Sequence, residues 1–228
     1  MSLKITIIAT MYSFTEENYI KTIFLLQEKQ KESINTNAIA QMLQTKASSV
    51  TDMLKKLSNK KLLTYKKYKG VELTENGKKI ALETVRKHRL WETFLYEKLK
   101  FTWDEVHDIA EQLEHIKSEK LTDRLDAFLG YPSFDPHGDP IPDKEGCFKQ
   151  NSFVPLTDNI NINKKNIVCG VLEHSTQFLK HLKNVGINLG STIKINKKNI
   201  YDNSLDVLVD DLKELSLSFK VASNILVK

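Results

Sequence analysis

The chain has 228 residues and carries 34 Lys and Arg against 29 Asp and Glu, which gives a net charge of +5 at pH 7. A chain of this length can bury a sizeable core and is expected to fold as more than one domain. No apolar stretch is long enough to span a bilayer, and the N-terminal stretch is too short and unfinished for a secretory signal. Cys147 and Cys169 lie too far apart for a zinc knuckle or a redox pair. We therefore expect a cytoplasmic protein with no membrane partner.

The charged residues are distributed unevenly along the chain. Nine lysines lie between Lys55 and Lys79, whereas aspartate and glutamate gather between Glu92 and Asp126. This asymmetry indicates a region that binds a polyanion, followed by a region that binds a cation.

The N-terminal part of the chain predicts a helix-turn-helix. Residues 15–28 begin with a capping residue and two acids and then show apolar residues at helical spacing. Two shorter helices are predicted at 38–43 and 47–57, separated by the tight connection 44–46. The second of them begins with small polar residues and ends with lysines, which is typical of a helix that enters a DNA groove.

Residues 62–74 follow directly and predict two short strands joined by a basic, glycine-containing tip, as in the wing of a winged helix. Hydroxyl groups at the start of the preceding helix can bond phosphates or base edges, and lysines of the wing can bind the sugar-phosphate backbone. A generic helical subdomain with a basic surface is the alternative, but it does not explain why both motifs occur in this order. The candidate DNA-binding residues are Thr36, Lys46, Ala47, Ser48, Ser49, Thr51, Asp52, Lys55, Lys66, Lys67 and Lys69.

The middle of the chain predicts three helices, at 74–99, 104–115 and 118–130. The first is long and apolar along one side, which suits a dimer seam.

These helices hold two groups of histidines and acids. Residues three or four apart on a helix share a face, so each group can point its side chains in one direction. Imidazole and carboxylate without thiolate suit a divalent ion such as Mn(II), Fe(II) or Zn(II). For any single pair, a solvated helix face is the alternative. The residues are His88 and Glu92 in the long helix, and His107, Glu111, Glu114 and His115 in the next one.

The last part of the chain has a different character. Residues 132–146 hold every proline but one, which predicts a stiff linker, and we interpret His137 and Asp139 within it as turn residues. Small strands with a single helix then suggest a compact β-barrel of the SH3 type. The strands are predicted at 167–172, 192–195, 206–209 and 217–221, and the helix at 175–185.

The predicted fold class is thus a mainly α N-terminal part, with a winged helix-turn-helix and a helical dimerisation domain, followed by a small SH3-like β-barrel. We place a DNA-binding domain at 12–74, a metal-binding and dimerisation domain at 75–131, a proline-rich linker at 132–152 and the SH3-like domain at 153–228.

The order of these motifs is specific. With VRKHRLWE at 85–92, VHDIAEQLEH at 106–115 and GDPIP at 138–142, the chain resembles the diphtheria-toxin-repressor family of metal-dependent transcriptional regulators. The resemblance begins at about Phe14 and includes a tail similar to the FeoA-type SH3-like domain of that family. It implies a homodimer that binds a palindromic operator in double-stranded DNA, with a divalent metal as co-repressor, and that represses genes for manganese or iron uptake.

The resemblance also implies two metal sites in each subunit. Iron-responsive members have a cysteine where this chain has Glu111, whereas manganese-responsive members have a glutamate, so Mn(II) is favoured and Fe(II) or Zn(II) are possible ions. The primary site would use Asn18, Glu111, Glu114 and His115. The ancillary site would use His88, Glu92 and His107, completed by His174 or Gln177 from the tail.

Two alternatives stay open at this point. In a winged-helix regulator whose metal is structural, chelation would leave DNA affinity unchanged. A di-metal enzyme would show metal-dependent turnover, but the chain lacks paired Glu-x-x-His repeats, a His-Glu-x-x-His motif and a glycine-rich phosphate loop. We therefore expect that the protein is not an enzyme.

Overall fold

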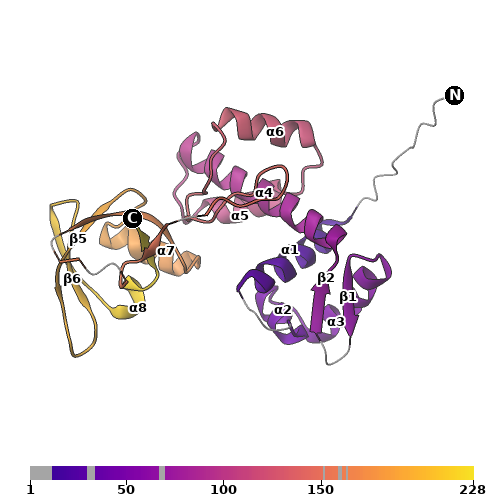
Figure 1. Cartoon of the computed structure of the whole chain (residues 1–228), viewed down its shortest axis with the longest axis horizontal. Helices are drawn as coiled ribbons and strands as arrows, with labels where there is room; N and C mark the ends of the chain where they lie inside the picture. The colour runs from indigo at the N-terminus through magenta and orange to yellow at the C-terminus, as the bar shows by residue number, and fades with distance from the viewer. Residues whose placement is uncertain (1–11, 30–33, 67–69, 151, 159–160, 163) are drawn as a thin grey trace. The chain divides into compact units, whose positions relative to one another are not determined.

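The computed structural model describes residues 12–29, 34–66, 70–150, 152–158, 161–162 and 164–228. Residues Met1–Val85 and Arg86–Lys228 form two compact units (Figure 1). No helix in the described ranges has the length and apolar character that a membrane crossing requires.

Within its described residues, the first unit contains three helices, a two-stranded hairpin and the start of a fourth helix, in the order predicted for a winged helix-turn-helix. Strands β1 and β2 pair antiparallel from Leu63 opposite Leu73 to Lys66 opposite Gly70. Helix α2 begins two residues before its predicted start, because the Asn35 side chain accepts a hydrogen bond from Ala38 N at 2.9 Å and caps the helix. The elements are α1 (Phe14–Lys29), α2 (Thr36–Met42), α3 (Ala47–Asn59), β1 (Leu63–Lys66), β2 (Gly70–Leu73) and the start of α4 (Glu75–Glu97).

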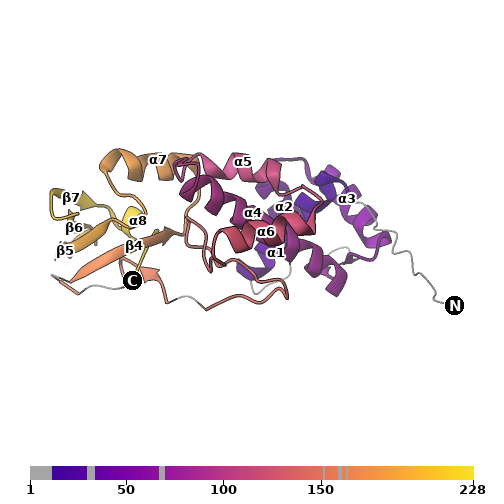
Figure 2. The same cartoon turned by 90° about the horizontal axis from the view of Figure 1, so that it is seen from above.

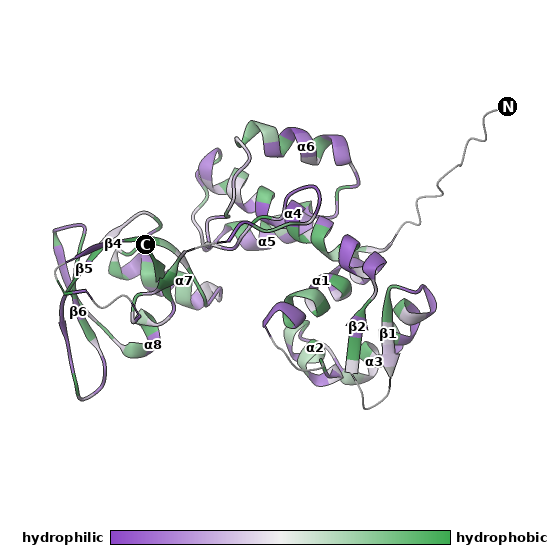
Figure 3. Ribbon diagram, in the orientation of Figure 1, coloured by the Kyte–Doolittle hydropathy of each residue, from purple (hydrophilic) through white to green (hydrophobic). Residues whose placement is uncertain are grey.

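The core of this unit is aliphatic. Its fully buried side chains include residues from each of the three helices, namely Ile20, Ile23, Ile39, Leu54 and Leu57. These residues recur at helical spacing, and green and purple alternate along the ribbons (Figure 3). Helix α3 keeps a polar face outward, whereas α1 is buried along most of its length and buries Glu16, Glu17 and Lys21 as well.

In the second unit, helices α5 (Val106–Leu113) and α6 (Glu119–Phe128) lie on different sides of α4 (Figure 2). Leu95 of α4 packs with Val106 and Ala110 of α5. Leu90 of α4 packs with Leu125 of α6. These contacts explain why α4 is apolar on more than one side.

The C-terminal region forms a six-stranded antiparallel sheet in the order β3-β8-β4-β5-β6-β7. Helix α7 packs on it through Leu179 and Leu182, which share a core with Trp103. The predicted closure of these strands into a barrel stays a prediction. The elements are β3 (Val154–Pro155), β4 (Lys165–Val171), α7 (Thr176–Val185), β5 (Thr192–Lys198), β6 (Leu205–Val209), β7 (Lys213–Leu217), α8 (Phe219–Ala222) and β8 (Ile225–Val227).

One predicted strand is wrong. The segment 217–221 ends strand β7 at Leu217 and then forms the short helix α8. The Ser218 side chain accepts a hydrogen bond from Val221 N at 3.3 Å and so caps a helical turn in a stretch whose composition favours a strand.

The proline-rich segment is an ordered turn that docks on β4. Asp135 Oδ1 accepts hydrogen bonds from the backbone N–H groups of His137 (2.8 Å) and Asp139 (3.0 Å). Val171 N donates to His137 O at 2.8 Å. A Cβ on Gly170 would lie 2.2 Å from that same oxygen, so only glycine permits this approach. This docking fixes the position of the His137 side chain.

Candidate metal centre

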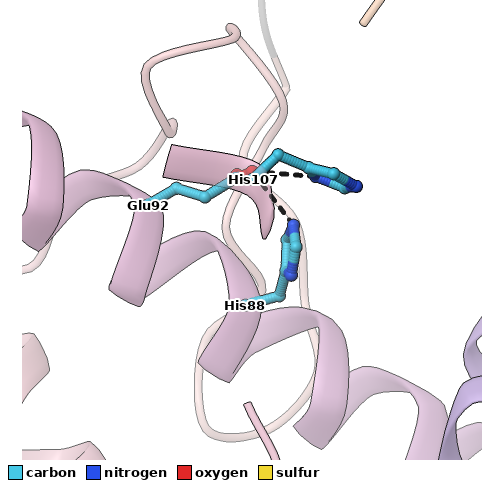
Figure 4. Close-up of side chains that lie close together, drawn as sticks. All are labelled: His88, Glu92 and His107. Carbon is cyan, nitrogen blue, oxygen red and sulfur yellow. Dashed lines mark hydrogen bonds and ion pairs between the residues drawn. The ribbon is translucent and has the colours of Figure 1, made fainter. Parts of the chain in front are cut away.

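The helical spacing of His88 and Glu92 places both side chains on one buried face of α4. His88 Nε2 lies 3.0 Å from Glu92 Oε1. His107, from the first turn of α5, points its Nδ1 at the same oxygen from 3.3 Å (Figure 4). The two imidazole rings meet edge to face with their centroids 5.0 Å apart. The structure thus brings together the three helical residues predicted for the ancillary site.

His88 also contacts the residues predicted for the primary site. Its Nδ1 lies 2.7 Å from Glu114 Oε2 and 3.7 Å from Glu111 Oε1. Glu114 is fully buried at the end of α5, and the neighbouring His115 is buried as well, with its Nε2 3.9 Å from Glu114 Oε1. The two predicted groups therefore lie side by side, with His88 between them.

A third group includes residues that the sequence did not single out as ligands. His137 Nδ1 lies 3.5 Å from Glu92 Oε1, and His137 Nε2 donates to the backbone oxygen of Trp103 at 2.8 Å. Ligand atoms of Glu92, Asp135 and His137 all lie within 4.8 Å of one another, and all three residues are buried. His137, interpreted from the sequence as a turn residue, belongs to this cluster as well as to the turn.

Glu92 is shared by the first and the third of these groups. Burial acts to raise the pKa of its carboxyl, but the charge of His88 and hydrogen bonds from His107, His137 and His88 outweigh it, so the pKa falls well below its usual value. The side chain is only 2% exposed. A buried carboxylate facing three imidazoles is a donor set that suits a divalent transition metal.

Electrostatic contacts hold the turn that carries His137. Arg89, one residue after His88 on α4, donates to the backbone oxygen of Pro140 and to Asp139 Oδ2 at 3.3 Å. Its Nε lies 3.7 Å from Asp135 Oδ2. Burial and the nearby charges of Asp139 and Glu92 raise the pKa of Asp135 well above its usual value. Arg89 therefore links α4 to the turn next to the cluster.

His137 titrates differently from a histidine in water. Burial acts to lower its pKa, but the hydrogen bond and charge of Glu92, with the charge of Asp135, raise the pKa to about 9. The ring stacks on His174 at a centroid distance of 5.2 Å. Burial lowers the pKa of His174, whose Nε2 donates to the Val171 backbone oxygen at 3.1 Å.

Two further predicted ligands, Gln177 and Asn18, take no part in the contacts described above. Gln177 is exposed on the first turn of α7. Asn18 belongs to α1 in the first unit, and its buried Oδ1 has no hydrogen-bond partner within the described ranges.

Most of the predicted DNA-binding residues lie in or directly before α3. Lys46, Ala47, Ser48, Ser49, Asp52 and Lys55 are exposed at α3. The Thr51 hydroxyl donates to Ala47 O at 3.0 Å, so it is engaged within the helix. Thr36 begins α2 and Lys66 ends β1, whereas Lys67 and Lys69 lie outside the described residues.

Three parts of the chain match known domains. Residues 11–71 match the N-terminal DNA-binding domain of iron dependent repressors, residues 74–143 match their metal binding and dimerisation domain, and residues 154–228 match the FeoA domain.

Curated relatives carry the same description. The iron-dependent repressor IdeR of Mycobacterium tuberculosis is 34% identical over 128 residues, which are 56% of this chain and 55% of that protein. This chain therefore spans about half the length of the mycobacterial repressors that it matches. The diphtheria toxin repressor of Corynebacterium diphtheriae is 28% identical over 212 residues, which are 87% of this chain and 93% of that protein.

Solved structures agree over nearly the whole chain. A manganese-dependent transcriptional repressor in complex with manganese has a TM-score of 0.77 and 33% identity, covering 93% of this chain and 98% of that one. ScaR with bound Zn2+ has a TM-score of 0.71 and 32% identity over the same shares.

Proposed function

The chain belongs to the iron-dependent repressor family, which includes the diphtheria toxin repressor, and on that basis we propose that it represses transcription by binding DNA when a divalent metal ion is bound. The family is one of transcriptional regulators, as the sequence predicted, and not of enzymes. The observation that carries the proposal is Glu92, whose carboxylate lies within 3.5 Å of three imidazoles from three segments of the chain.

The ancillary site would be built on this carboxylate. Its proposed ligands are His88, Glu92 and His107. We add His137, because its Nδ1 lies 3.5 Å from Glu92 Oε1 although the two residues are far apart in the sequence. His174 stacks on His137 and so remains a candidate, whereas the exposed Gln177 has less support.

The primary site would use Glu111, Glu114 and His115, completed by Asn18. The buried, unpartnered Oδ1 of Asn18 supports this role, because a buried polar atom without a partner is destabilising until something binds it.

Mn(II) is the ion that we favour. The proposed ligands supply only imidazole nitrogen and carboxylate or amide oxygen, and a glutamate at position 111 favours a harder ion than a thiolate would. The related structures support a divalent ion, since one repressor holds manganese and ScaR holds Zn2+ or Cd2+.

The metal would act as an allosteric ligand of a homodimer. Metal bound by α4, α5 and α1 would favour one placement of the two DNA-reading heads, and only one placement fits successive half-sites of a palindromic operator. By linkage, DNA binding would raise metal affinity by the same factor. Genes for manganese or iron uptake are the proposed targets, in the cytoplasm.

The domain plan is also a proposal. We keep a DNA-binding domain at 12–74, a metal-binding and dimerisation domain at 75–131, a linker at 132–152 and a C-terminal domain at 153–228. The matches at 11–71 and 154–228 support the first and last of these, whereas the match to the metal binding and dimerisation domain runs to residue 143 and so includes the first part of the proposed linker. We propose that the C-terminal sheet closes into a small SH3-like barrel.

The test is fluorescence anisotropy of the full chain on promoter fragments, in chelator and then with Mn(II), Fe(II) or Zn(II). The proposal predicts DNA binding that rises at least tenfold with metal. If the metal-bound protein bound DNA no better than the protein in chelator, the result would instead favour a winged-helix regulator whose metal is structural.

A further inference from the structure

Glu16 is a charged residue buried in the first turn of α1, where its side chain is only 1% exposed. Its Oε1 lies 2.6 Å from Lys60 Nζ and 3.3 Å from Lys56 Nζ. Both lysines stand at the C-terminal end of α3, the helix that carries most of the proposed DNA contacts. All of these residues lie in the first unit.

The other carboxylate oxygen is held by the start of α1 itself. Ser13 N donates to Glu16 Oε2 at 2.9 Å, and Glu16 N donates to Ser13 Oγ at 3.3 Å. This reciprocal pair is a capping box, which satisfies two of the free N–H groups at a helix start. One oxygen therefore fixes Glu16 to α1, while the other binds α3.

The contacts keep the carboxylate ionised. Burial acts to raise the pKa of Glu16, but hydrogen bonds from Lys60, Ser13 and Lys56 outweigh it and lower the pKa to about 2. The carboxylate is buried, whereas the two lysine side chains reach into solvent, so loss of the lysines would leave a negative charge in a poorly solvated place and would be destabilising.

We infer that Glu16 is a positioning residue for DNA recognition, which clamps the C-terminal end of α3 to α1 and thereby sets the direction in which α3 presents Ser48 and Ser49. The inference rests on the proposed function. In this proposal Lys56 and Lys60, whose side chains are 56% and 33% exposed, contact Glu16, whereas Lys55 does not and remains available for phosphate.

The clamp gives α1 contacts on two sides. Successive residues of a helix are about 100° apart, so Asn18 points to nearly the opposite side of α1 from Glu16. A metal ion that moves or fixes α1 through Asn18 would therefore act on α3 through Glu16.

For loss of Glu16, electrostatics alone and the clamp predict opposite changes in DNA affinity. Removing a negative charge from a DNA-binding unit and releasing two lysines should strengthen binding to every duplex. If Glu16 positions α3, its loss should weaken binding to the preferred sequence, because base contacts depend on the orientation of the helix and nonspecific contacts do not.

The experiment measures this difference with Glu16→Gln and with Glu28→Gln, a matched change on an exposed residue of the same helix. The probes are the duplex that the wild type selects from a random pool in Mn(II) and a scrambled duplex of equal composition. We expect Glu16→Gln to reduce the ratio of the two affinities at least tenfold, with unchanged or higher affinity for the scrambled duplex. Glu28→Gln should leave both affinities within twofold. An unchanged ratio, or an equal loss on both probes, would overturn the inference.

A second variant covers the case in which Glu16→Gln fails to fold. Lys60→Met leaves the capping box in place and removes the nearest cation, and we expect the same fall in the ratio. Hydrogen exchange of the metal-loaded chain without DNA should show at least tenfold faster exchange at the C-terminal end of α3. Unchanged exchange would refute the clamp, and a wild type that selects no duplex would refute the proposed function alone.

Discussion

The polar faces of α3 and of α4 differ in what surrounds them. At the start of α3 the polar residues are exposed, and Lys55 and Asp52 make an ion pair that is itself open to solvent. On α4, His88 and Glu92 are buried and face further ionisable groups from α5 and from the linker. Exposed charges are stabilised by water, and the lysines among them are free to bind a polyanion, whereas buried charges are stabilised by one another. Substitutions should therefore have larger effects around Glu92 than on α3.

The largest effect is expected from Glu92→Gln. It removes the carboxylate shared by three histidines, so metal affinity at the ancillary site should fall by at least the roughly 10- to 100-fold that loss of a hydrogen-bond partner of a ligand costs. Breaking a buried pair should also lower the stability of the metal-free protein by about 3 kcal/mol. Calorimetric metal titration and thermal unfolding measure the two effects. Glu97→Gln, an exposed change on the same helix, should alter neither.

His137→Asn should have the next largest effect. The variant keeps the turn, whose hydrogen bonds come from backbone groups and Asp135, but removes an imidazole from Glu92. We expect metal affinity to fall by roughly 10- to 100-fold. His181→Asn on the exposed face of α7 is the control. Equal affinities for the two variants in a competition with a chromogenic chelator would remove His137 from the site.

Gly170→Ala tests whether docking on β4 positions His137. The added Cβ would lie 2.2 Å from the His137 backbone oxygen, so the turn must shift, at a cost of about 1–3 kcal/mol. Metal affinity should fall severalfold in the wild-type background and change little in a His137→Asn background, because the two changes act through one contact. Equal effects in both backgrounds would mean that the glycine acts elsewhere.

Periodicity predicts helices α1 to α7 and the ligand pairs within them, although it misses the short helix α8. His88 and Glu92 are one turn apart, so their shared face follows from helix geometry alone. It also predicted the order of helices and hairpin in the first unit.

The contact of His137 with Glu92 could not be predicted in this way. It joins a turn to a helix across 45 residues (137 minus 92) and depends on Gly170 and Arg89, which no local pattern relates to it. The short helix α8 was missed for the converse reason, because one capping serine outweighs the strand propensity of its neighbours.

The smallest effect is expected on the exposed face of α3. Lys55→Met should weaken binding to all duplexes by a similar factor and reduce the slope of log affinity against log salt concentration by about 1, because one phosphate contact is lost. Lys180→Met on α7 should leave the slope unchanged. A loss confined to the selected duplex would show that Lys55 reads bases instead.

We propose that helix α4, helix α5 and the linker turn converge on Glu92 to form the ancillary metal site. Anomalous diffraction from crystals loaded with Mn(II) tests it most directly. We expect an anomalous peak about 2.0–2.2 Å from a Glu92 oxygen, with nitrogen atoms of His88, His107 and His137 around the same ion. An ion bound with His137 turned away, or peaks only at other side chains, would contradict it.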